Sequence, residues 1–185
     1  MKTAETAKAA QENYLATLVS AGPMEIELIV AKYWTDIWNY AFVLTKKHDL
    51  ADDVAQDTFV QALLGLDKFR GQASVKTWLL KICHNVAMNQ LKSAFFRKIF
   101  PVASVRHSGQ SASAESVFFA KTKLDAVWEN MLELPLKHRE VIILEIKYEL
   151  SIADIADFLG IAEGTVKSRL HRAKAQMRKK WKEEE

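Results

Sequence analysis

The stretch Ser151–Arg172, SIADIADFLGIAEGTVKSRLHR, decides the fold of the C-terminal half of the chain. Ser151 and Asp154 have the spacing of a capping box, in which a hydroxyl and an acidic side chain close the first turn of a helix. Gly160 stands where the chain must turn, because glycine adopts a left-handed backbone without steric cost. Ala156 is small enough to let two helices cross closely. The pattern predicts a helix-turn-helix.

The second helix of this motif is strongly basic. The whole chain has 26 Lys and Arg against 23 Asp and Glu, a net charge of +3, but residues 163–182 alone hold eight basic side chains and one acidic one. Val166 and Leu170, one turn apart, predict the side that packs on the first helix. The other side suits the major groove of DNA, where Arg and Lys reach base edges and phosphates. The alternatives are a helix-turn-helix that never touches DNA and a charged face that is only solvated. The candidate DNA-binding residues are Thr165, Lys167, Ser168, Arg169, His171 and Arg172.

Helices are also predicted outside this motif. In 185 residues there are only six Gly and three Pro, which argues against a turn-rich β fold. Apolar residues recur every three or four positions, as Ile29, Tyr33, Ile37, Tyr40 and Leu44 do. The predicted helices cover residues 24–44, 49–64, 78–91, 124–134, 137–148, 151–159 and 163–182. Val141, Ile142 and residues 144–146 are expected mainly inside.

A polar segment divides the chain into two parts. Residues 92–98 are basic and aromatic, and residues 108–113, SGQSAS, have the composition of a linker. The predicted fold class is all-α, with two small helical domains joined by a flexible linker. The predicted boundaries are an N-terminal extension at 1–23, a first domain at 24–94, a linker at 95–120 and a second domain at 121–185.

Composition argues against several other classes of protein. The one cysteine, Cys83, excludes a disulfide framework and is expected to be a buried structural thiol in a reducing compartment. No run of 18 apolar residues and no signal peptide are evident, so we expect a cytoplasmic protein that does not insert into membranes. The five histidines are scattered, and no Ser-His-Asp order, phosphate loop or catalytic carboxylate pair is evident. We therefore expect no metal, no cofactor and no enzymatic activity.

The helix predicted at 49–64 has an acidic side. We expect Asp49 to cap its N-terminus, where a carboxylate suits the positive end of the helix dipole. The side expected to be buried carries Val54, Phe59, Leu63 and Leu64. The polar side carries Asp49, Asp52, Asp53, Gln56 and Asp57. Three interpretations of this side are open: a docking face, a solvated surface, or a carboxylate site for a hard cation. The cation site has no EF-hand spacing to support it.

Two groups of residues, in order along the chain, resemble bacterial sigma factors. Residues 134–141, LPLKHREV, together with the helix-turn-helix at 151–177, resemble region 4 of that family. The segments that resemble regions 2.2 to 2.4 are 49–59 (DLADDVAQDTF), 69–71 (FRG), Trp78-Leu79, Ile82 and Asn85. The order and spacing over residues 25–180 are similar to those of the small extracytoplasmic-function (ECF) sigma factors, which keep regions 2 and 4.

The resemblance implies a protein that binds core RNA polymerase and directs it to promoter DNA. The residues Asp49, Asp52, Asp53, Gln56 and Asp57 would dock on the clamp helices of the β′ subunit, where charge orients a complex more than it tightens it. Region 4 would touch the β flap through apolar surface within 141–148. The linker would run through the active-site cleft or act as a passive tether. An anti-sigma factor, often membrane-anchored in this family, is the further partner implied.

By the same resemblance, residues 69–89 would recognise and open the −10 promoter element. Unstacked bases need aromatic or apolar pockets and polar edge contacts, and the family captures a flipped base in the loop that here is 71–75, GQASV. The residues implied are Arg70, Gln72, Ser74, Lys76, Trp78, Lys81, Asn85 and Asn89. For Trp78 a core position is favoured, with base stacking as the alternative. Many members have Asp where this chain has Asn89, which leaves the preferred −10 sequence open.

The helix at 163–176 would read the −35 element. The alternative function is a stand-alone helix-turn-helix regulator with an unrelated N-terminal domain, which would bind a palindrome as a dimer. A third class is a helical enzyme or metal protein that uses the acidic cluster at 49–57. Run-off transcription with core polymerase separates the three, because only a sigma factor gives a promoter-specific transcript.

Overall fold

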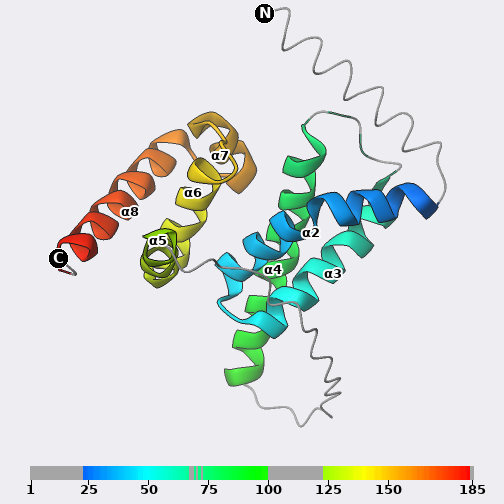
Figure 1. Cartoon of the computed structure of the whole chain (residues 1–185), viewed down its shortest axis with the longest axis horizontal. Helices are drawn as coiled ribbons and strands as arrows, with labels where there is room; N and C mark the ends of the chain where they lie inside the picture. The colour runs from blue at the N-terminus through cyan, green and yellow to red at the C-terminus, as the bar shows by residue number, and fades with distance from the viewer. Residues whose placement is uncertain (1–22, 67–68, 70, 72, 100–122, 184–185) are drawn as a thin grey trace, which may run out of the picture. The chain divides into compact units, whose positions relative to one another are not determined.

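The computed structural model describes residues 23–66, 69, 71, 73–99 and 123–183. Every regular element in these residues is an α-helix, and the chain divides into two compact units between Lys92 and Ser93 (Figure 1). The predicted all-α fold with two helical domains is confirmed. The N-terminal extension and most of the predicted linker lie outside the described residues. None of the helices in the described part is long and apolar enough to span a membrane.

The first unit is built on a helical hairpin. Helices α2 (Pro23–Thr45) and α3 (His48–Gly65) pack along each other, and α4 (Val75–Ile99) completes the core. Proline suits the first position of α2, since its fixed φ is already helical and it has no N–H to leave unpaired. The predicted apolar period of α2 is confirmed, because Ile29, Tyr33, Ile37, Tyr40 and Leu44 are all buried.

Two details of α3 differ from the sequence prediction. The N-cap is Lys47 and not Asp49, because Lys46 adopts a positive φ of 59° that reverses the chain directly after α2. Asp49 instead lies in the first turn, where the helix dipole still favours a carboxylate. Leu63 and Leu64 are exposed, with Leu64 at 76%. The buried side is formed by Ala51, Val54, Ala55, Thr58, Phe59 and Ala62, whose small residues let α2 approach closely.

From residue 123 to 183, the described part of the second unit forms the helices α5 (Lys123–Glu133), α6 (Leu136–Ile146), α7 (Ile152–Leu159) and α8 (Glu163–Glu183). The predicted capping box is confirmed, since the Ser151 hydroxyl accepts from the Asp154 N–H and the Asp154 carboxylate accepts from the Ser151 N–H. Gly160 ends α7 with a φ of 67°, as the predicted turn requires. Val166 and Leu170 are buried, so the helix-turn-helix is confirmed.

The core of the second unit lies under α6. Val141, Ile142 and Leu144 are buried as expected, but Ile146 is 62% exposed although the sequence placed it mainly inside. Ile146 is the last residue of α6, where the helix stops before the turn at 147–150 and no following helix covers its side chain.

Helix α4 is longer than the pattern predicted. It begins at Val75 and runs to Ile99, so the helix extends into residues 95–99 of the predicted linker. Cys83 lies in its middle, fully buried, and its thiol points to the Ile37 carbonyl oxygen at 3.7 Å. Burial raises the pKa of this thiol to about 12, against a smaller opposing effect of the Thr58 hydroxyl. The predicted buried thiol is confirmed.

Candidate polymerase-binding and DNA-binding surfaces

The acidic residues of α3 do not form one free surface. Asp49, Asp53 and Gln56 are exposed on the side that faces away from α2. Asp52 lies at one edge of the helix, where Trp38 Nε1 donates to its Oδ1 at 2.6 Å. Asp57 lies at another edge, where Gln90 Nε2 of α4 donates to its Oδ2 at 3.0 Å. Among the described residues, the side chains of Asp52 and Asp57 are thus held by other helices of the unit, whereas those of Asp49, Asp53 and Gln56 point to solvent.

A row of aromatic rings supports the edge of α3 that carries Asp52. Trp38 stacks on Phe42 with centroids 5.4 Å apart, and both rings contact the imidazole of His48, at 5.5 and 4.6 Å. Further along the hairpin, Trp34 stacks on Phe59 at 5.8 Å. Aromatic packing of this kind adds stability beyond area burial. It holds the two helices in a fixed register, so the α3 surface is presented on a rigid support.

The exposed side of α3 continues with apolar residues, of which Leu63 and Leu64 were expected to be buried. Val60, Leu63 and Leu64 follow Asp53 and Gln56 at helical spacing, and all three are large exposed hydrophobics. We call Asp49, Asp53, Gln56, Val60, Leu63 and Leu64 the outer face of α3. The signal was present in the sequence, because Ala51, Ala55 and Ala62 mark a buried stripe that leaves these leucines on the opposite side. A helical face that is acidic at one end and apolar at the other is suited to a protein partner.

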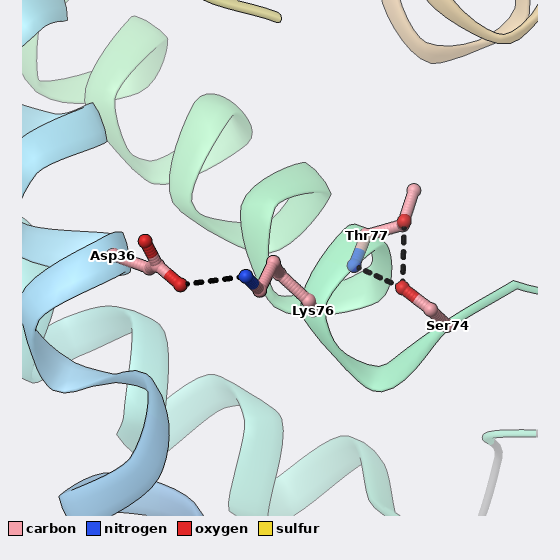
Figure 2. Close-up of polar contacts among 4 residues, drawn as sticks. All are labelled: Asp36, Ser74, Lys76 and Thr77. Atoms are coloured by element: carbon pink, nitrogen blue, oxygen red, sulfur yellow. Dashed lines mark hydrogen bonds and ion pairs between the residues drawn. The ribbon is translucent and has the colours of Figure 1, made fainter. Parts of the chain in front are cut away.

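The start of α4 is held by two sets of contacts, drawn in Figure 2. The Ser74 hydroxyl accepts from the Thr77 N–H at 3.0 Å and lies 2.8 Å from the Thr77 hydroxyl, so Ser74 caps the helix. Lys76 forms an ion pair with Asp36 of α2 at 2.8 Å. Both residues were predicted to contact DNA. In the free protein they fix the first turn of α4 to the hairpin.

The other predicted −10 residues lie along α4. Asn85 and Asn89 are exposed and one turn apart on the same side. Lys81 is half-buried. Trp78 is half-buried as well, with its ring 4.6 Å from the ring of Phe69 and next to Gly65, so it fits neither a pure core position nor a free stacking platform. Arg70 and Gln72 lie outside the described residues.

The exposed side of α8 presents most of the predicted −35 residues. Lys167, Ser168, His171 and Arg172 are exposed, and Thr165 is half-buried beside them. Thr165, Ser168 and Arg172 follow one another at spacings of three and four residues, which places them in one row along the helix. The Ser168 hydroxyl donates to the Thr165 carbonyl oxygen at 2.9 Å, and Lys167 pairs with Glu163 at 3.5 Å, so these side chains stay close to the helix.

Arg169 lies next to that row but is bound to another helix. Its Nη1 donates to Oε1 of Glu140 on α6 at 2.9 Å, and the exposed fractions of the two side chains are 24% and 10%. Lys174 pairs with Glu145 of α6 at 2.5 Å, and Lys180 pairs with Glu133 of α5. With Lys167 on Glu163, at least four of the eight cations between residues 163 and 182 are bound to carboxylates of their own unit, three of them to carboxylates of α5 and α6. The sequence could not separate them from the cations that face solvent.

Within the described residues, no group of three or more His, Cys, Asp or Glu side chains is placed to hold a metal ion. The carboxylates of α3 diverge around the helix, with Asp52 bonded to Trp38 and Asp57 bonded to Gln90.

Comparison with known proteins identifies the family. Residues 29–95 match Sigma-70 region 2, and residues 124–177 match Sigma-70 region 4. Together these matches cover most of the chain, which belongs to the sigma-70 family of RNA polymerase sigma factors. Within that family it is an ECF sigma factor, and its function is that of an RNA polymerase sigma factor.

Three relatives illustrate the match. The chain is 34% identical over 156 residues to RNA polymerase sigma factor YlaC of Bacillus subtilis, covering 83% of this chain and 90% of YlaC. It is 35% identical over 140 residues to ECF RNA polymerase sigma factor SigL of Mycobacterium tuberculosis, covering 74% and 77%. Among solved structures, the sigma factor RpoE of Bartonella quintana, in complex with the anti-sigma factor NepR, superposes with a TM-score of 0.68 at 26% identity, covering 85% of this chain and 97% of RpoE.

The match to region 2 also decides against the stand-alone regulator, because that alternative required an unrelated N-terminal domain.

Proposed function

We propose that the two units of this sigma factor divide the recognition of polymerase and promoter between them. The first unit binds core RNA polymerase through the outer face of α3 and handles the −10 element with α4. The second unit reads the −35 element with α8. The observation that carries this proposal is the pair of exposed helical faces, one acidic and apolar on α3, the other basic and polar on α8.

The outer face of α3 suits the clamp helices of the β′ subunit. Asp49 and Asp53 supply charge that steers and orients the encounter. Val60, Leu63 and Leu64 supply apolar area, which gives most of the affinity in a protein interface. Asp52 and Asp57 take a secondary part, because Trp38 and Gln90 already hold their carboxylates.

The start and outward side of α4 suit an opened −10 element. Asn85 and Asn89 can both donate to and accept from base edges. The Trp78 and Phe69 rings form an apolar wall beside the loop that the family uses to capture a base. The capped first turn and the ion pair of Lys76 with Asp36 give this loop a fixed end.

Further partners follow from the family. The exposed Ile146 is the candidate contact for the β flap, because it is a large apolar side chain at the end of α6. Because RpoE was solved with an anti-sigma factor, we propose that an anti-sigma factor holds this protein inactive. We place its action in the cytoplasm, where RNA polymerase and the chromosome are, and assign the chemistry of transcription to the polymerase and none to this chain.

Run-off transcription with purified core polymerase tests the proposal. We expect a promoter-specific transcript that is lost when the −35 element is scrambled. In the Arg172→Gln variant, we expect the yield of transcript to become insensitive to base changes at particular −35 base pairs. Arg178→Gln is the matched control, since Arg178 is exposed on the same helix but lies almost two turns beyond Arg172. A transcript whose yield does not depend on the −35 sequence would remove the assigned role of α8.

A further inference from the structure

We propose that Arg169 does not read DNA but, together with Glu140, fixes the rotation of the recognition helix α8 about its own axis. This inference rests on the proposed role of α8 in reading the −35 element. It names Glu140 and Arg169 as positioning residues for that element, with Glu145 and Lys174 as a second pair on the opposite flank.

The first observation is the position of Arg169 on the helix. The buried stripe of α8 is Val166, Leu170 and Ala173. Arg169 lies on one flank of this stripe and Lys174 on the other, since successive residues are about 100° apart around a helix. The row formed by Thr165, Ser168 and Arg172 lies on the opposite, exposed side. Arg169 therefore lies between the buried stripe and this row, one turn from Thr165, and its guanidinium bonds to Glu140 of α6.

The second observation is what Arg169 and Lys174 contact. Arg169 pairs with Glu140 at 2.9 Å and Lys174 with Glu145 at 2.5 Å, so α6 holds α8 on both sides of the apolar stripe. Apolar contacts are non-directional, and one of the three buried residues is only an alanine. Ion pairs with good geometry have direction, and two of them on opposite flanks resist rotation either way.

The third observation is the burial of Glu140. Its side chain is 10% exposed, and Arg169 is its ion-pair partner on α8. Turning α8 away from Glu140 would break this ion pair and leave the nearly buried carboxylate with the neighbouring Arg139 but without Arg169, which has a cost. A rotation of α8 would move Ser168 and Arg172 away from the base edges that they reach, and recognition in the major groove tolerates little misplacement.

The experiment measures the affinity of the holoenzyme for promoter fragments in which each −35 base pair is changed in turn. Arg169→Gln and Glu140→Gln are compared with Arg172→Gln, at a temperature where circular dichroism shows every variant folded. We expect both positioning variants to lose affinity about tenfold for all fragments alike, in the range found for residues coupled in one pair. The variant that carries both Arg169→Gln and Glu140→Gln should lose no more affinity than the single variant that binds the fragments more weakly. Arg172→Gln should instead relax discrimination at particular base pairs.

A second variant separates positioning from mere stability. Replacing both residues, Glu140→Met with Arg169→Met, exchanges the buried ion pair for apolar packing, which is often neutral for stability. We expect this variant to melt close to the parent protein and still bind every −35 fragment more weakly, because apolar packing does not fix rotation. Full affinity in this variant would reduce the pair to a stabilising contact and overturn the inference.

The outcomes for the inference and for the proposed function are distinguishable. In one outcome, Arg172→Gln and Arg169→Gln each relax discrimination at a different base pair, and Glu140→Gln has no effect. Arg169 then contacts a base itself, and only the inference fails. If Arg172→Gln leaves discrimination at every −35 base pair unchanged, the proposed function of α8 fails, and the inference fails with it.

Discussion

Arg139 lies buried at the start of α6 and closes the preceding helix. Its Nη1 donates to the carbonyl oxygens of Leu132 at 2.9 Å and Leu134 at 3.0 Å. Carbonyls at the end of α5 have no partner within that helix, so a buried donor must supply one. Burial lowers the pKa of the Arg139 guanidinium to about 10, opposed by the adjacent Glu140, and the group remains charged at neutral pH.

We expect Arg139→Met to destabilise the second unit by about 2–3 kcal/mol, because two carbonyls lose charge-assisted bonds and Glu140 loses a neighbouring cation. Lys137→Met is the control, since Lys137 is exposed in the first turn of the same helix and its loss should change stability by less than about 0.5 kcal/mol. Urea unfolding followed by circular dichroism measures both. Equal effects of the two substitutions would contradict the capping role.

Cys83 gives a prediction about pH. Its thiol has a pKa of about 12 in the folded protein and near 9 when unfolded, because burial disfavours the thiolate. A pKa raised by folding adds stability below pH 9 that is lost as the pH rises toward 12. We therefore expect the stability of Cys83→Ala to fall less than that of the parent protein between pH 9 and pH 12. Alkylation should be slow in the native protein and fast in urea, and rapid native alkylation at pH 8 would show that the thiol is accessible.

At the scale of helices, α7 and α8 show where a pattern in the sequence was sufficient, and α3 shows where it was not. The capping box, the left-handed glycine and the pair Val166 and Leu170 are local signals, and each predicts one interaction that the backbone then requires. The side of α3 was harder to assign, because Leu63 and Leu64 are as apolar as core residues. The side of α3 that is covered depends on the neighbouring helix, and that side carries the small residues Ala51, Ala55 and Ala62. The same limit applies to Arg169, whose partner Glu140 is 29 residues away in the sequence.

The outer face of α3 yields a prediction for core binding. We expect Leu64→Glu to weaken holoenzyme assembly at least about tenfold, since it removes an apolar contact and adds charge to the apolar end of the face. Asp53→Lys should weaken assembly mainly through a slower association rate that depends on salt. Gln61→Lys is the matched control, because Gln61 is exposed on α3 but lies outside this face. Titration of labelled protein with core polymerase measures all three, and a Gln61→Lys loss as large as that of Leu64→Glu would place the contact elsewhere.

For the molecule as a whole, the net charge of +3 conceals two surfaces of opposite character on two separate units. The charged residues of each segment could be counted from the sequence. Which of them pair with one another and which face solvent could not be predicted from it. Of the eight cations between residues 163 and 182, Arg169, Lys174 and Lys180 pair with carboxylates on α5 and α6, and Lys167 pairs within α8. Under the proposed function, the charge that α8 offers to DNA is therefore smaller than the count of +7 indicates, and base recognition falls to the short row Thr165, Ser168 and Arg172.

Separate surfaces on separate units have a measurable consequence, which is independence. Substitutions with no shared partners contribute additively to binding. We expect Arg172→Gln to leave the affinity of the free protein for core polymerase unchanged. We expect Asp53→Lys to leave −35 discrimination unchanged once core is saturating. The double variant should show both defects, each at its single-variant size within about 0.5 kcal/mol. A larger departure, measured by core titration and by competition between promoter fragments, would mean that core binding on α3 alters how α8 meets DNA.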